Sequence, residues 1–180
     1  MEKVPLHIIH LDQDDPNKCT ARKLERFGHA NVHSNIYKSP KRGFLLDPAA
    51  GLLLGPDDKV LIEKGASIVA LDCSWKLLTE SLEIIHKKTK LKGRTLPLVL
   101  AANPVSWGKL GRLSTAEALA LSLVLINKWE QARSIMKPFR FGDTFFQLNS
   151  EPMEAYSAAT SNSELAELQW EFFDKPSSNL

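Results

Sequence analysis

Ser114 and Glu117 lie three residues apart, directly after a polar segment, 103–113, that contains Gly108 and Gly111. A serine hydroxyl can accept a hydrogen bond from the first turn of a helix while a glutamate three residues later reaches back, so the pair predicts a helix that starts at Ser114. N–H groups at a helix start have no partner within the helix, and they suit a small anionic or zwitterionic ligand. Most strand–loop–helix units are purely structural, so the spacing leaves both a binding site and a simple cap open.

Basic residues form clusters in a chain whose formal net charge is only +2. The clusters are Lys38, Lys41 and Arg42; Lys87, Lys88, Lys90, Lys92 and Arg94; and Lys109 and Arg112. Two of them accompany the segment 94–125, so their side chains are candidates for contact with nucleic-acid phosphates. A solvated surface is the default explanation for charge clusters, and the sequence alone leaves both open.

The other side chains with metal-binding or nucleophilic chemistry show no functional spacing. Cys19 and Cys73 are the only cysteines and lie far apart, so we expect neither a disulfide framework nor a metal site, and a reducing compartment. The acids of the turn 12–15 have no second carboxylate cluster at helical spacing. The N-terminus lacks a secretory signal, and the apolar run 116–126 is too short to cross a bilayer. We therefore expect a soluble, intracellular protein without a membrane partner.

Strands and helices must alternate along the chain to position these residues. Apolar runs predict strands over 6–11, 51–54, 67–72 and 96–102. Capping and stop residues predict helices over 21–27, 58–64, 75–86, 114–136, 152–159 and 163–173. The expected N-caps of the first three are Thr20, Asp57 and Ser74. Turn formers dominate 31–55, and 139–149 is an aromatic-rich excursion.

This alternation in 180 residues predicts one α/β domain with a largely parallel sheet. Ligands of such sheets bind beyond the carboxyl ends of the strands. The turn that ends at Thr20, the turn 72–75 and the loop 103–115 should therefore meet. No GxGxxG or Walker pattern is present, so a dinucleotide or P-loop site is unsupported. The residues alone thus predict an α/β binding protein with a basic rim.

Five sequence blocks occur in the order seen in a known enzyme family. They are DPNKCTARKL (15–24), ALDCSW (70–75), LPLVLAANPVSWG (96–108), RLSTAEALA (112–120) and FRFGDTFFQLN (139–149). No single block is specific, but the five in register resemble the small-subunit ribosomal RNA aminocarboxypropyltransferases. The match covers nearly the whole chain.

The resemblance implies a SPOUT-like α/β fold with a C-terminal trefoil knot, closed by C-terminal helices, rather than a Rossmann methyltransferase fold. It implies S-adenosyl-L-methionine as substrate, without a metal. The implied reaction transfers the 3-amino-3-carboxypropyl group to N3 of a (methyl)pseudouridine in small-subunit rRNA, releasing methylthioadenosine during ribosome biogenesis. The implied partner is small-subunit rRNA or the pre-ribosomal small subunit. We expect a cytoplasmic monomer with one domain over 1–180, of which about 1–65 is an N-terminal part and 66–175 the knotted, cofactor-binding part.

The resemblance also assigns chemistry to Asp72 and Trp75. In the family the tryptophan of the DCSW block lies against the methyl group, so Trp75 would shield the methyl, leave the methylene open and favour the sulfonium by a cation–π contact. Asp72 matches the family's aspartate, and an ionised carboxylate near a weakly acidic N3–H suits a general base. The alternative roles, Trp75 as a packed core residue and Asp72 as the cap of the following helix, stay open.

The remaining implied contacts are mostly made by the main chain. The positions that match the family's are Leu71 for the ribose, Leu96 and Gly111 for the adenine edge, and Thr20 and Thr115 for the substrate carboxylate. The expected RNA-contacting residues are Lys88, Lys90, Arg94, Lys109 and Arg112.

The sequence departs from the family pattern in two places. Val105, Ser106 and Trp107 stand where Asn-Tyr is typical, and Gly111 stands where an aromatic residue is common, so the adenine should lose some stacking. Two rival interpretations remain. One is a SPOUT-type rRNA methyltransferase that uses the same substrate in another orientation; the other is a ribosome-assembly factor that binds rRNA without turnover.

Overall fold

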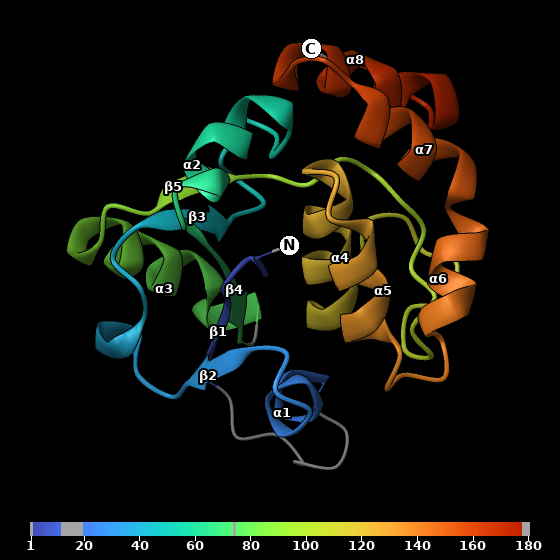
Figure 1. The fold of residues 1–180 in the computed structure, drawn as a ribbon. Helices are drawn as coiled ribbons and strands as arrows, with labels where there is room; N and C mark the ends of the chain where they lie inside the picture. The colour runs from blue at the N-terminus through green and yellow to red at the C-terminus, as the bar shows by residue number, and fades with distance from the viewer. Residues whose placement is uncertain (1, 12–19, 74, 178–180) are drawn as a thin grey trace.

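The computed structural model of the chain describes residues 2–11, 20–73 and 75–177. Five parallel strands form one sheet in the order β2-β1-β4-β3-β5 (Figure 1). The strands are β1 (Leu6–His10), β2 (Asn31–His33), β3 (Gly43–Leu46), β4 (Ser67–Asp72) and β5 (Lys92–Arg94). The α/β class and the parallel sheet predicted from the sequence are therefore confirmed.

Helices cover both faces of this sheet. They are α1 (Thr20–Arg26), α2 (Lys59–Glu63), α3 (Trp75–Lys88), α4 (Thr115–Leu125), α5 (Trp129–Met136), α6 (Gly142–Leu148), α7 (Ser150–Ala158) and α8 (Asn162–Phe172), with 3-10 turns η1 (Ile36–Lys38) and η2 (Pro56–Asp58). In Figure 1, α3 lies on one side of the sheet and α4 with α5 on the other, and α6, α7 and α8 lie outside α4 and α5. In the described part of the chain, no helix is both long and apolar enough to cross a membrane.

Alternating side chains of β1, β3 and β4 enter two separate cores. Val69 of β4 packs with Ile85 of α3, whereas its neighbours Ile68 and Ala70 join the core formed with α4. Successive side chains of a strand point to opposite faces, so a strand that is apolar at both kinds of position must be covered twice. This explains why the uninterrupted apolar run 68–71 marked the central strand correctly.

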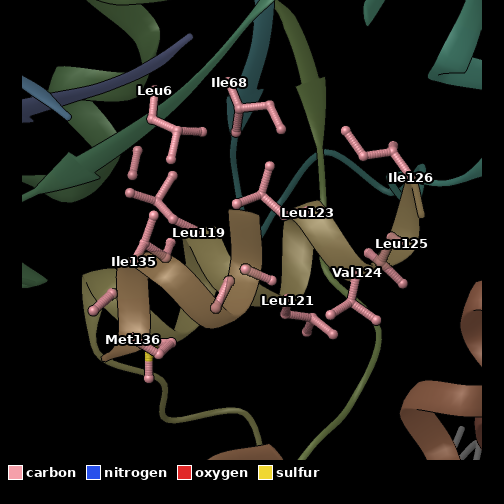
Figure 2. Close-up of a cluster of buried hydrophobic side chains, with 14 of the residues drawn as sticks. Leu6, Ile68, Leu119, Leu121, Leu123, Val124, Leu125, Ile126, Ile135 and Met136 are labelled. Carbon is pink, nitrogen blue, oxygen red and sulfur yellow. The ribbon is translucent and has the colours of Figure 1, made fainter. Parts of the chain in front are cut away.

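Helix α4 is buried on nearly all sides. Figure 2 shows Leu119 and Leu123 pointing toward Ile68 of the sheet, while Leu121 and Val124 point away from it. All four leucine and valine side chains of α4 named here are fully buried. A helix that is apolar all round occupies the centre of a protein rather than its surface.

The predicted helix 114–136 is interrupted. Helix α4 ends at Leu125, and Asn127 adopts a left-handed backbone with φ of 62° before α5 begins at Trp129. Asparagine is among the few residues other than glycine that visit this conformation readily, so the helix ends well before Pro138.

The predicted strand 96–102 is wrong as a strand, although the segment is extended and partly buried. Its backbone is satisfied partly by the main chain of residues 108–111 and partly by side chains from distant helices. Leu100 donates its N–H to Oδ1 of Asn149 (2.7 Å) and accepts from Nδ2 of the same residue (2.8 Å). The Tyr156 hydroxyl donates to the Leu98 carbonyl (2.8 Å), and Oε1 of Gln169 accepts the Leu98 N–H (3.2 Å).

Several smaller predictions also need correction. Segment 31–55 contains β2 and β3, the basic linker contains β5, and 139–149 contains α6. Segment 51–54 forms only an isolated bridge, between Leu53 and Thr95. Asp57 lies within η2 and accepts the N–H of Asn162 at the start of α8 (3.1 Å) instead of capping α2. Thr20 is the first residue of α1, and the predicted cap Ser74 lies outside the described residues.

Candidate functional site

A cavity of about 460 Å³ opens beyond the carboxyl ends of β3, β4 and β5 and beside the start of α4. Its volume falls in the range of small-molecule sites. The predicted site residues that line it are Leu71, Asp72, Arg94, Leu96, Gly111, Arg112 and Thr115. The structure thus joins the turn after β4 with the loop 103–115, as the position of the strand ends predicted.

The start of α4 forms one wall of this cavity. Ser114 Oγ accepts the Glu117 N–H (3.3 Å), and Glu117 Oε2 accepts the Ser114 N–H (2.8 Å), which confirms the predicted capping box. Glu117 does more than cap, because its Oε1 also accepts the N–H groups of Ala102 (2.7 Å) and Asn103 (2.9 Å). This fully buried carboxylate therefore fastens the loop 103–113 to the helix start that lines the cavity.

Asp72 ends β4 and lines the cavity beside a histidine that the sequence did not single out. His10 Nδ1 lies 3.1 Å from Asp72 Oδ2; the His10 side chain is 5% exposed and that of Asp72 is 31% exposed. The two residues are register partners on adjacent parallel strands, so their backbones hold them together. The carboxylate is thus oriented from the buried side while it remains accessible from the cavity. Only knowledge of the β1–β4 pairing could have revealed His10.

Main-chain positions complete the lining of the cavity. Gly111 adopts a left-handed backbone (φ 70°) and donates its N–H to Val99 (2.9 Å). A side chain here would meet only Leu98 at ordinary contact distance, so the backbone angle rather than space favours glycine. Leu71 and Leu96 line the same cavity, as predicted.

Two predicted cofactor-binding residues are not placed in the cavity. Thr20 is partly buried in the first turn of α1 and does not belong to the described cavity lining. Trp75 begins α3 shortly after Asp72, the last residue of β4, but its side chain lies outside the described part of the structure. Both assignments remain predictions.

The predicted RNA-contacting residues fall into two groups. Arg94 is held inward: its Nη2 lies 3.0 Å from Asp58 Oδ1, its Nε lies 3.1 Å from Asp58 Oδ2, and its guanidinium lies 5.3 Å from the centre of the Phe44 ring. Its charge is therefore neutralised, which favours a structural role over RNA contact. The exposed residues are Lys88, Lys90, Lys109 and Arg112.

Fold and cavity together define an α/β protein with a small-molecule site at the carboxyl edge of a parallel sheet and basic residues at its rim. Residues 44–173 match the family described as "Ribosome biogenesis protein, C-terminal".

Named relatives narrow this class. The 16S rRNA aminocarboxypropyltransferase of Methanosarcina mazei is 41% identical over 92% of this chain and 93% of its own length. The 16S rRNA aminocarboxypropyltransferase of Methanocaldococcus jannaschii is 39% identical over 94% of this chain and 96% of its own length. The structure of the "SAM-dependent rRNA:acp-transferase Tsr3 from Vulcanisaeta distributa" matches with a TM-score of 0.77 and 32% identity, over 94% of this chain and 96% of that one. This chain belongs to the 16S rRNA aminocarboxypropyltransferase family.

Residues 4–35 also match a family described as "Possible Fer4-like domain in RNase L inhibitor, RLI". Iron–sulfur clusters are typically held by four cysteine thiolates. The segment contains only Cys19, so its residues do not fit such a cluster. Across 2–11, 20–73 and 75–177, no three histidine, cysteine or acidic side chains are grouped to hold a metal ion.

Proposed function

We propose that this protein transfers the 3-amino-3-carboxypropyl group of S-adenosylmethionine to a base of small-subunit rRNA. The observation that carries the proposal is one cavity that unites Asp72, the start of α4 and the main chain at Leu96 and Gly111, in a chain that belongs to the 16S rRNA aminocarboxypropyltransferase family. The related structure from Vulcanisaeta distributa is described as SAM-dependent, which supports this substrate.

The chemistry depends on how the sulfonium is oriented. All three carbons bonded to the sulfur are activated, so the pocket must present the methylene of the amino-acid arm to the nucleophile. N3 of a pseudouridine or methylpseudouridine forms the new N–C bond, and the C–S bond breaks with its electron pair passing to sulfur, which gives methylthioadenosine. Asp72 takes the N3 proton, and His10 orients that carboxylate through the 3.1 Å contact.

The remaining assignments follow the lining of the cavity. Leu71 contacts the ribose, Leu96 and Gly111 contact the adenine edge, and Thr115 at the start of α4 receives the carboxylate of the amino-acid arm. From the turns beside the cavity, Thr20 adds to the carboxylate site and Trp75 shields the methyl group.

The RNA lies across the rim of the cavity. Lys109 and Arg112 are exposed beside the opening, whereas Lys88 and Lys90 are exposed between the end of α3 and the start of β5, toward the amino edge of the sheet. These four side chains contact phosphates, whereas Arg94 stays paired with Asp58.

The protein acts on the assembling small subunit in the cytoplasm, as a monomer. Size-exclusion chromatography with light scattering tests the monomer, and a dimer mass would contradict it.

The chain threads as a SPOUT-like trefoil knot. Support comes from the segment 95–113, yellow-green in Figure 1, which runs between α4 and the C-terminal helices. It is fastened on one side by Glu117 and on the other by Asn149. Joining the termini through a long linker in the folded state and then denaturing would leave a knotted circle. An unchanged elution volume relative to a circle closed in denaturant would contradict the knot.

Mass spectrometry of small-subunit rRNA from cells with and without this protein tests the function. The account predicts one base heavier by the aminocarboxypropyl group only when the protein is present. A methyl difference indicates a methyltransferase, and an unchanged rRNA indicates an assembly factor without turnover.

Asp72→Asn should lower the transfer rate by about 10²-fold or more, with S-adenosylmethionine affinity changed less than threefold. Unchanged turnover in this variant would remove Asp72 from the mechanism.

A further inference from the structure

The loop beside the cavity exposes apolar side chains to solvent. Val105 is 89% exposed, Trp107 58% and Leu110 41%. Scattered exposed apolar residues are ordinary, but here three lie within six positions of one loop. The large aromatic ring of Trp107 is the side chain that gains most from a flat partner.

Hydrogen bonds fix the backbone of this loop, so Trp107 is exposed on an ordered segment. Lys109 closes a turn by donating its N–H to Ser106 (2.9 Å), and its carbonyl accepts the N–H of Ala101 (2.9 Å). Gly108 donates to the Ala101 carbonyl (2.8 Å) with a left-handed backbone, φ 71°. Asn103 Oδ1 also accepts the Ser106 N–H (3.0 Å). Trp107 is therefore held outward on a rigid support.

The charged residues of this loop are all basic. Lys109 and Arg112 are exposed in the same loop, and no acidic residue occurs between 103 and 113. Arg112 also lines the cavity, so the basic and aromatic surface continues to the rim of the proposed reaction site. Aromatic side chains among cations are the combination that binds unpaired nucleotides, through base stacking and phosphate contact.

We propose that Trp107 stacks on an unpaired base adjacent to the modified one, while Lys109 and Arg112 contact the flanking phosphates. This inference rests on the proposed function, because a base that reacts at N3 must leave its pair and thereby frees its neighbours from the helix. The loop would then hold the RNA strand in register, so that the correct base enters the cavity. S-adenosylmethionine binding does not require this contact.

The test uses the full chain and two RNA probes, a 12-nucleotide single-stranded uridine oligomer and isolated small ribosomal subunits that lack the modification. Trp107→Ala should weaken RNA binding by about tenfold, which corresponds to about 1.4 kcal/mol. Trp107→Phe should recover most of the affinity. Phe27→Ala is the matched control, because Phe27 is an aromatic residue of similar exposure, 54%, at the end of α1. It should bind RNA as the wild type does.

The two kinds of contact separate in their salt dependence. Lys109→Gln should reduce the slope of log affinity against log salt by about 0.7, whereas Trp107→Ala should lower affinity at every salt concentration with an unchanged slope. S-adenosylmethionine affinity, measured by calorimetry, should stay at the wild-type value in both variants.

Equal RNA affinity of Trp107→Ala and wild type would overturn the inference, as would an equal loss in Phe27→Ala. The inference would also be overturned if Trp107→Ala weakened binding to anionic lipid vesicles but left binding to RNA unchanged. Failure of the proposed function is distinguishable: wild-type protein would then release no methylthioadenosine in the presence of RNA, whatever the effect of Trp107→Ala on binding.

Discussion

The role expected for Arg94 from the sequence differs from the role that its partner in the structure indicates. It belongs to a basic cluster in the sequence, yet its side chain is only 15% exposed and is bidentate to Asp58, which is 4% exposed. The pair joins β5 to the turn before α2 and lies at the edge of the cavity. At this residue, the ion pair with Asp58 favours a structural role over RNA contact.

Arg94→Lys should therefore reduce stability rather than RNA affinity. Lysine keeps the charge but cannot form the planar two-pronged contact, so we expect a loss of about 1–3 kcal/mol in the free energy of unfolding. Urea denaturation measures the loss, and the exposed Lys90→Gln should change it by less than about 0.5 kcal/mol. Weaker RNA binding by Arg94→Lys at unchanged stability would contradict this assignment.

His7 and His33 make stability depend on pH at the edge of the sheet. Their rings are stacked, and His7 Nδ1 lies 2.9 Å from His33 Nε2. Burial, and secondarily the charge of His33, lowers the pKa of His7 from 6.5 to about 4. Between pH 6.5 and 4 the unfolded chain therefore binds more protons at His7 than the folded protein does, and stability falls as pH falls through this window.

Urea denaturation at pH 7 and pH 4.5 measures this effect. After allowance for solvent screening, His7 should account for about 1 kcal/mol of the stability lost between the two. His7→Gln should reduce the loss by about that amount. Burial, and secondarily the charge of Lys3, also lowers the pKa of His29. The pH dependence of stability in His29→Gln therefore serves as the comparison over the same pH range. An identical pH dependence in wild type and His7→Gln would refute the assignment.

Among the elements, the extended segment 96–102 depends most on distant residues. Asn149 is fully buried between α6 and α7, and its amide donates to the carbonyls of Leu100 (2.8 Å) and Phe145 (2.9 Å) while accepting the Leu100 N–H (2.7 Å). One side chain thus satisfies both backbone groups of Leu100, while Val99 and Ala101 bond to the main chain of residues 108–111. Because Leu96 and Leu98 of this segment line the cavity, its placement also shapes the site.

Asn149→Asp should disrupt this arrangement. The new carboxylate oxygen would face two carbonyls, so we expect the free energy of unfolding to fall by about 2–4 kcal/mol and affinity for S-adenosylmethionine to fall with it. Thermal denaturation and calorimetric titration measure the two effects. Gln147→Ala, at an exposed position of α6, is the control and should change neither. Wild-type stability in Asn149→Asp would show that the segment does not depend on this amide.

The elements also show where sequence patterns succeed. The strand 67–72 was predicted with its observed bounds because its apolar run is bounded by Gly65 and by the turn before α3. Strands β2 and β5 have three residues each, which is too short to show a period. The extended course of 96–102 was predictable, but its side-chain partners Asn149 and Gln169 lie about 50–70 residues later, where no local pattern points to them.

At the scale of the whole molecule, the parallel sheet explains why the site was largely predictable. The carboxyl ends of its strands share one edge, so Leu71, Asp72 and Leu96 line one cavity although they belong to different segments. The start of α4 joins them there through its capping box. What the sequence could not give were pairings between distant polar groups, such as His10 with Asp72, because those depend on the order of the strands.

We propose that this cavity presents the amino-acid arm of a sulfonium nucleoside to an RNA base. Incubation of the purified protein with S-adenosylmethionine and unmodified small ribosomal subunits, followed by chromatography of the released nucleoside, tests it most directly. The account predicts methylthioadenosine in amounts equal to the RNA modified. Release of S-adenosylhomocysteine, or of no nucleoside product, would contradict it.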